Sequence, residues 1–182
     1  MESTSNTKKL TRASMLLIFA FIIIFIGSRT GGAMFNQFVV GPLVNAVILT
    51  AVLITDMKHG ILVGILTPVL AAITGQLNAP MVPFMPFIMI GNALLALVFG
   101  LIYKKNEKFG QYIGIVLGSV LKALFLTLSA KYLVSAFKIN IPEKVMPKLL
   151  AAMSAPQLYS ALAGGIIALL FYKAYKKYYL KA

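Results

Sequence analysis

Residues 111–130 read QYIGIVLGSVLKALFLTLSA, an apolar stretch that carries a single charged side chain, Lys122. A continuous apolar run of about 20 residues spans the hydrocarbon core of a bilayer as an α-helix. The run does not alternate between apolar and polar residues, so it does not read as a strand of a membrane β-barrel. The stretch therefore predicts a transmembrane helix with a charge inside the membrane.

The rest of the chain repeats this pattern. Hydrophobic residues make up 60% of the 182 residues and charged residues only 12%, whereas about a quarter of a soluble domain is charged. The apolar segments cover residues 11–26, 40–55, 61–74, 84–103, 111–137 and 154–172. We therefore expect an all-α integral membrane protein, with one membrane domain over residues 1–182 folded as a six-transmembrane-helix bundle. A removable signal peptide is the alternative for the first segment, but no clear A-x-A cleavage pattern follows it.

Lysine and arginine beside the segments predict the orientation, because they favour the cytoplasmic side. With six spans both termini lie on one side, and that side collects Lys8, Lys9, Arg12, Lys58, Lys104, Lys105, Lys108, Lys173, Lys176, Lys177 and Lys181. The other side collects Arg29, Lys138, Lys144 and Lys148. Both termini are therefore predicted to be cytoplasmic. The net charge of +13 is assigned to helix orientation and anionic lipid, and no nucleic-acid partner is expected.

Lys122 is the sharpest functional signal. It lies about 16 Å along the helix from Gln111 at 1.5 Å per residue. A charge at that depth is costly and normally faces the protein interior or a cavity. Gly114 and Gly118 precede it at four-residue steps, and small residues mark close helix contact. We expect an inward-facing cation that meets an anionic group of a solute; the alternative is a lysine that snorkels to an interface or binds backbone carbonyls.

Three amides lie inside the segments: Asn45 in the second, Asn92 in the fourth and Gln157 near the start of the sixth. Such amides either bond a solute or only join helices, and both readings stand for Asn92 and Gln157. Helix contact is the preferred reading for Asn45.

The outer connections are longer than the cytoplasmic turns. Residues 27–38 carry Arg29 and Asn36, and residues 75–83 carry Gln76 and Asn78. These connections either fold over a site near the outer face or are solvated connectors.

Several chemistries lack the residues they need. The chain has no cysteine and one histidine, His59, and its four acids fall outside the apolar segments. No catalytic residue, metal site or cofactor is therefore expected, and proton-coupled transport is disfavoured. The sequence also contains no phosphate-binding loop, so the chain is not expected to hydrolyse ATP.

Three stretches suggest a family: FVVGPLVNA at 38–46, GILVGILTP at 60–68 and PFIMIGNALL at 86–95. With the size and the six spans, they resemble the substrate-binding S components of energy-coupling factor (ECF) vitamin transporters. The resemblance covers nearly the whole chain.

This resemblance implies a multi-pass subunit in the plasma membrane of a prokaryotic cell. It would capture a vitamin or related micronutrient with high affinity and import it with a transmembrane coupling protein and two ATP-binding cassette ATPases. S components typically carry an Ala-x-x-x-Ala surface on the first helix for the coupling protein. Here Ala13 is followed by Leu17, and Ala20 is out of that register; these three residues are the predicted docking positions.

The predicted solute site combines three kinds of side chain. Lys122 and Arg29 would hold a negative group. Polar edges would meet Asn92, Gln157, Asn36, Gln76 and Asn78, and an apolar or aromatic part would meet Phe35, Phe38, Phe84 and Tyr159. The alternative function is a stand-alone small channel or oligomeric carrier. An assembly or scaffold subunit is a further alternative, and a membrane enzyme is disfavoured because the residues for its chemistry are missing. The solute is left open between an anionic vitamin or precursor and a neutral heterocycle.

Overall fold

The computed structural model describes residues 6–179, which are helical apart from short connections. Six long helices form the bundle: α1 (Asn6–Thr30), α3 (Gly41–Ile54), α4 (Met57–Ile73), α5 (Met85–Lys105), α6 (Glu107–Leu128) and α9 (Ala155–Tyr179). Shorter pieces join them: α2 (Ala33–Phe35), the π-helix η1 (Asn36–Val40), the 3-10 helix η2 (Ala79–Phe84), the π-helix η3 (Ser129–Leu133), α7 (Val134–Ala136) and α8 (Met146–Ala152).

Length and apolar composition allow five helical stretches to cross a membrane: Asn6–Thr30, Asn36–Ile54, Ala79–Lys105, Glu107–Ala136 and Met146–Tyr178. Helix α4 is also apolar but shorter, with 17 residues. The all-α class and the count of six helices are thus confirmed.

The boundaries differ from the expected ones at three places. The connection at 27–38 is mostly helical, because only Gly31 and Gly32 interrupt the helix before α2 and η1 resume it. The connection at 138–148 ends in α8, whose Pro147 lies in the first turn, where its missing N–H costs nothing. The basic stretch after residue 172 continues as helix α9, although Lys181 and Glu2 lie outside the described residues.

Helix α3 is the centre of the bundle. It contacts α1, α4, α5 and α9, and ten of its fourteen residues are buried. Gly164 of α9 permits a close approach to α3, because a Cβ there would lie 2.6 Å from both the Cβ of Asn45 and the carbonyl oxygen of Pro42. The α3–α9 contact therefore fixes the position of Asn45 inside the bundle.

Glycines also bring α6 against α5. A Cβ on Gly114 would lie 3.0 Å from the Phe99 ring, and one on Gly118 would lie 3.2 Å from Leu95. Small residues at a helix interface let the backbones approach closely. The predicted glycine face of α6 thus packs on α5 and points Lys122 into the bundle.

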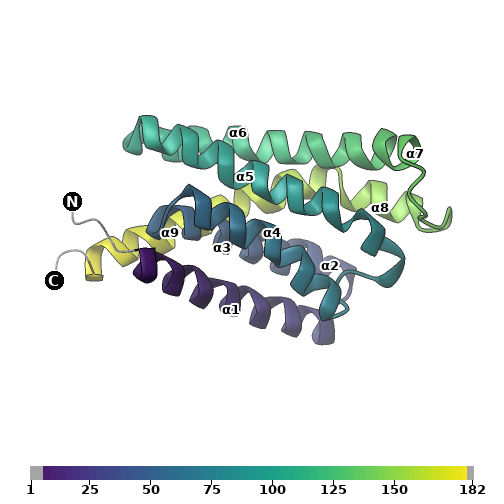
Figure 1. Ribbon diagram of the computed structural model, residues 1–182, viewed down its shortest axis with the longest axis horizontal. Coiled ribbons are helices and arrows are strands. Elements are labelled where there is room, and N and C mark those ends of the chain that lie inside the picture. The colour runs from purple at the N-terminus through teal and green to yellow at the C-terminus, as the bar shows by residue number, and fades with distance from the viewer. Residues whose placement is uncertain (1–5, 180–182) are drawn as a thin grey trace.

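Both ends of the described chain lie at one end of the bundle. Figure 1 shows the start of α1 and the end of α9 together, with α2, α7 and α8 at the opposite end. This agrees with an even number of spans. The side of the membrane on which this end lies stays a prediction from the charge pattern.

Asp56 ties α1 to the α3–α4 turn at that terminal end. Its carboxylate accepts hydrogen bonds from the backbone N–H of His59 at 3.1 Å and from Lys9 of α1 at 3.2 Å, and His59 Nδ1 lies 2.8 Å from it. Partial burial alone would raise the pKa of Asp56, but the hydrogen bonds from His59 and Lys9 outweigh it and lower the pKa to about 2. The ionised carboxylate therefore stabilises this end of the bundle.

The Gly164 contact predicts the outcome of Gly164→Ala. The added methyl must push α9 off α3, which typically costs roughly 1–3 kcal/mol and outweighs the gain in helix propensity. Gly32→Ala is the matched control, because a Cβ there meets no atom within 4 Å. Thermal unfolding in detergent should show a lower Tm for Gly164→Ala only; equal Tm values for both variants would contradict the close contact.

The Asp56 cluster predicts a pH-dependent stability difference. Because its folded pKa is below the value of about 3.9 in unfolded chains, the charge stabilises fully above about pH 4 and the effect is lost as the pH falls toward 2. Asp56→Asn should lower stability by less than about 1 kcal/mol at pH 7, and the gap from wild type should narrow below pH 4. Exposed Glu143, changed to Gln, is the control. A gap unchanged down to pH 3 would show that the charge has no role.

Candidate functional site

A cavity of about 730 Å³ lies inside the bundle toward the end opposite the termini. Its volume falls within the range of about 300–1,000 Å³ typical of small-molecule sites. The polar lining residues are Asn36, Gln37, Asn45, Thr67, Gln76, Asn78, Asn92, Lys122, Lys148, Gln157 and Ser160. The others are glycine or aliphatic: Ile24, Val40, Gly41, Val44, Pro68, Ala71, Leu77, Met81, Ile88, Ala151, Ala152, Met153 and Pro156.

Lys122 is the most deeply placed charge on the cavity wall. Only 3% of its surface is exposed, and its ammonium donates a hydrogen bond to the carbonyl oxygen of Asn45 at 2.6 Å. Thus the helix α6 lysine meets α3 across the interior and does not snorkel to an interface.

A directed chain of hydrogen bonds continues from this contact to α9. The amide nitrogen of Asn45 donates to the Ser160 hydroxyl at 3.2 Å, and that hydroxyl donates to the backbone carbonyl of Gln157 at 3.2 Å. Because the amide nitrogen is used for Ser160, the oxygen of Asn45 must face the ammonium. The chain fixes the position of the lysine head and joins three helices.

The ammonium of Lys122 is left without a negative partner. An ammonium has three N–H donors, and Asn45 takes one. No acid lines the cavity in the part of the chain that the structure describes, and the ion pairs found there both involve Asp56 at the terminal end. Two N–H groups of a buried cation are therefore available to a bound group, and a carboxylate or phosphate supplies what they need.

Asn92 is held in place by α4. Its amide nitrogen donates to the carbonyl oxygen of Gly64 at 3.1 Å and to the Thr67 hydroxyl at 3.3 Å. This is possible because Gly64 lets α4 approach the Asn92 backbone, where a Cβ would lie at 3.2 Å. Both donor contacts use the nitrogen, so the carbonyl oxygen of Asn92 is the atom available to a ligand.

Helix α8 covers one side of the cavity and is fixed by its C-terminal carbonyl groups. Gln157 donates to the carbonyl oxygen of Ala152 at 3.2 Å, and Thr127 donates to that of Met153 at 2.9 Å. Leu149 anchors the same helix in a second apolar cluster with Phe84 and Leu126. Lys148 on α8 lines the cavity but is exposed, so it belongs to the mouth.

The structure brings most of the predicted site residues together. Those lining the cavity are Lys122, Asn92, Gln157, Asn36, Gln76 and Asn78. Asn36 also carries a buried side-chain oxygen with no hydrogen-bond partner.

The remaining predicted residues do not line this cavity. Arg29 lies on the exposed side of α1, over the Phe25 ring at 5.4 Å. Phe35, Phe38 and Tyr159 are also exposed, Phe38 by 55% and Tyr159 by 63%. These side chains point outward, where apolar and aromatic groups are as stable in lipid as in the interior.

Phe84 is absent from the cavity wall for a different reason. It is fully buried, but in the second apolar cluster, where its ring stacks on Phe87 with centroids 5.0 Å apart. It therefore supports the end of the bundle and does not contact the cavity.

Sequence reasoning missed five polar residues on the wall: Gln37, Asn45, Thr67, Lys148 and Ser160. Helix contact, the reading preferred for Asn45, is confirmed, because its side chain bonds Lys122 of α6 and Ser160 of α9. Its place on the cavity wall was not predicted; as the only amide of its segment it stood out in the sequence, but nothing there indicated a cavity or a partner. The sequence carried no signal that Thr67 and Ser160 line a cavity, since hydroxyl side chains in helices usually bond the backbone of their own helix.

The predicted docking positions on α1 also need correction. Ala13 is 3% exposed and Ala20 0%, because this face of α1 packs on α3 and α4. Leu17 is only half-buried against the same core. Small residues spaced by seven therefore mark contact within the chain, and Ala13 and Ala20 offer no surface to a partner.

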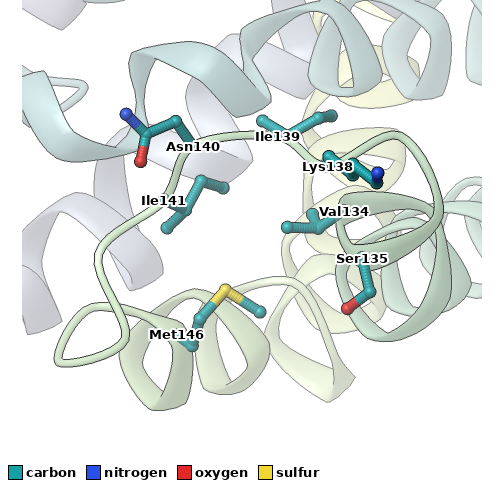
Figure 2. A pocket seen from close by; sticks show the side chains of 7 residues that line it. All are labelled: Val134, Ser135, Lys138, Ile139, Asn140, Ile141 and Met146. Atoms are coloured by element: carbon teal, nitrogen blue, oxygen red, sulfur yellow. The ribbon is translucent and has the colours of Figure 1, made fainter.

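A second, smaller hollow of about 410 Å³ lies outside this cavity. Figure 2 shows Ile141, Val134 and Met146 turned toward it and Asn140 pointing away. It shares no lining residue with the larger cavity. Its walls come from α7, from the connection that follows it and from the first residue of α8, and its polar groups do not converge.

Comparison with known families agrees with this architecture. The model of the family described as "ECF transporter, substrate-specific component" matches residues 8–174. The chain therefore belongs to the substrate-specific components of ECF transporters. Neither a curated protein nor a solved structure gave a match.

Membership defines the general role of the molecule. The chain is a multi-pass membrane protein and a substrate-binding subunit for micronutrient uptake. Such subunits bind the solute and are not themselves catalytic.

Proposed function

We propose that the cavity captures an anionic vitamin or related micronutrient with high affinity from outside a prokaryotic cell. The chain would then pass it inward together with a coupling protein and two ATP-binding cassette ATPases. The observation that carries this proposal is the Lys122 ammonium, which lies on the cavity wall with two N–H groups free and one neutral partner.

Burial of the Lys122 charge costs hydration free energy. An ammonium removed from water loses several kcal/mol of hydration, and one amide oxygen replaces little of it. An anionic group that enters the cavity supplies both the opposite charge and two hydrogen-bond acceptors. Binding therefore relieves an existing cost, which favours a ligand with a carboxylate or phosphate.

The charge pattern supports an outward-facing cavity. The cavity lies at the end opposite the termini, while most lysine and arginine residues lie near the terminal end. The positive-inside rule places the terminal end in the cytoplasm. A solute would then enter from the external side of the plasma membrane.

The source of energy would lie outside this chain. Its sequence has no phosphate-binding loop, and substrate-specific components work with membrane and ATPase modules. Accumulation against a gradient is therefore assigned to the assembled transporter.

Removal of the charge at residue 122 is the direct test of ligand capture. We expect Lys122→Met to weaken binding of the co-purifying ligand, identified by mass spectrometry, by about 30-fold or more, since losing one partner of a buried charge pair costs 2–5 kcal/mol. Asn45→Asp should weaken it as well, because an internal carboxylate neutralises the ammonium. Lys131→Met, an exposed lysine further along the same span, is the control.

Calorimetry on the purified proteins measures these affinities. If Lys122→Met and Asn45→Asp fold as wild type and keep its affinity, Lys122 does not hold the ligand. A loss of ligand affinity in these two variants, with the affinity of Lys131→Met unchanged, supports the proposal.

Reconstitution separates this function from that of a stand-alone channel or carrier. Vesicles holding this chain alone should bind the radiolabelled ligand without accumulating it. Accumulation should require the coupling protein, both ATPases and ATP. Equilibration of the ligand across vesicles by this chain alone would favour the channel or carrier instead.

A further inference from the structure

The lining of the cavity has an unusual composition. Seven of its side chains are amides and two are hydroxyl-bearing, while most of the rest are aliphatic. Among the lining residues that the structure describes, none is aromatic and none is acidic. This composition is informative because the chain has 12 Phe and 8 Tyr, so aromatic side chains were available.

We propose that the ligand is an aliphatic carboxylate rich in amide or hydroxyl groups and not a heteroaromatic compound. This inference rests on the function proposed above and narrows its substrate. It excludes two classes that the sequence left open, the neutral heterocycle and the anionic vitamin with a flat ring system.

Among its described residues, the cavity wall offers no aromatic surface to a flat ring. Flat ring systems are commonly held by aromatic side chains, and offset-stacked ring pairs are more favourable than their buried area alone gives. The walls here are formed by branched and flexible aliphatic groups such as Ile24, Val44 and Ile88. These side chains match methyl and methylene groups and offer no stacking plane. The aromatic residues expected to cover the ligand lie on the outer surface or in the second apolar cluster.

The amides surround the cavity from different elements. Those of Asn36, Asn92 and Gln157 donate their nitrogens to groups of the protein and so present their oxygens to a ligand. Asn36 and Gln37 come from η1, Asn78 from the connection before η2, Asn92 from α5 and Gln157 from α9. Such an arrangement suits a ligand with several hydrogen-bond donors, such as hydroxyl or amide N–H groups, spread along its length. A single ring with polar groups on one edge would leave several of these oxygens, such as that of Asn36, without a partner.

The charge of the cavity wall favours an anionic ligand. Both charged residues on the wall are lysines, Lys122 in the interior and Lys148 at the mouth. A cationic solute is repelled by both, whereas an anionic one is attracted at the mouth and held inside. The free N–H groups of Lys122 can donate to a carboxylate oxygen, and the ammonium supplies the opposite charge.

The first measurement is made on the ligand released by denaturing the purified wild-type protein. Mass spectrometry in negative mode and near-ultraviolet absorption of the protein-free fraction define its class. We expect an anion without near-ultraviolet absorption. A released compound that absorbs there as a heteroaromatic ring overturns the inference and leaves the proposed binding function standing.

The second measurement compares four defined probes by thermal shift and calorimetry. Pantothenate is an aliphatic hydroxy-amide carboxylate, and panthenol has the same skeleton with an alcohol in place of the carboxylate. Nicotinate and riboflavin are the aromatic probes, the first with the same charge as pantothenate. We expect pantothenate to bind at least about tenfold more tightly than the other three, the ratio that 1.4 kcal/mol gives.

Lys122→Met distinguishes a binding role from a structural one in this comparison. The variant should remove the preference for pantothenate over panthenol, which a general loss of packing would not do.

Tighter binding of nicotinate or riboflavin by the wild-type protein overturns the aliphatic class, and equal binding of pantothenate and panthenol overturns the carboxylate. Absence of any released ligand together with no binding of all four probes would overturn the proposed function itself. If no probe binds, a released aliphatic anion still supports the inference.

Discussion

The hydrogen bond between the ammonium of Lys122 and the side-chain oxygen of Asn45 is the contact around which the rest of the bundle is arranged. A charge inside a membrane protein must be satisfied by the protein itself or by what it binds. Two glycine contacts make this contact possible: Gly118 brings α6 against α5, and Gly164 brings α9 against the Asn45 turn of α3. The small residues that pack the helices therefore also place the charge on a cavity wall.

Around that contact, the amide nitrogens of Asn45 and Asn92 donate to groups of the protein. The Lys122 ammonium, in contrast, has only one hydrogen-bond acceptor from the described part of the protein. Asn45 is oriented by Ser160, and Asn92 is held by Gly64 and Thr67. Each amide spends its nitrogen on the scaffold, which fixes the direction in which its oxygen points. Preorganised polar groups in a largely aliphatic cavity give selectivity, because a ligand that cannot pair with them leaves buried groups unsatisfied. The Lys122 cation adds discrimination by charge to this discrimination by shape.

Much of the fold could be predicted from the sequence, because continuous apolar runs and their charged flanks define helices in a membrane. The inward direction of Lys122 could also be predicted, since one charge and two glycines mark a single face. The partner of that charge could not, because Asn45 lies 77 positions away and the two residues are brought together by the packing of both α3 and α6 against α5 and α9. Aromatic residues misled the prediction for a related reason: Phe38 and Tyr159 are as stable facing lipid as facing the core. Ala13 and Ala20 were ambiguous in the same way. The spacing of small residues indicates a close helix contact, but it does not indicate whether the contact is with a helix of the same chain or with a partner.

Ligand capture depends on the Lys122 cation, which completes its hydrogen bonding with a ligand inside the bundle. An experimental structure of the purified protein with its co-purified ligand tests this most directly. We expect an anionic oxygen of the ligand about 2.7–3.2 Å from Nζ of Lys122, with the Asn45 contact retained. A structure in which Nζ of Lys122 reaches lipid headgroups, or in which the ligand lies elsewhere and the cavity is filled by side chains, would contradict it.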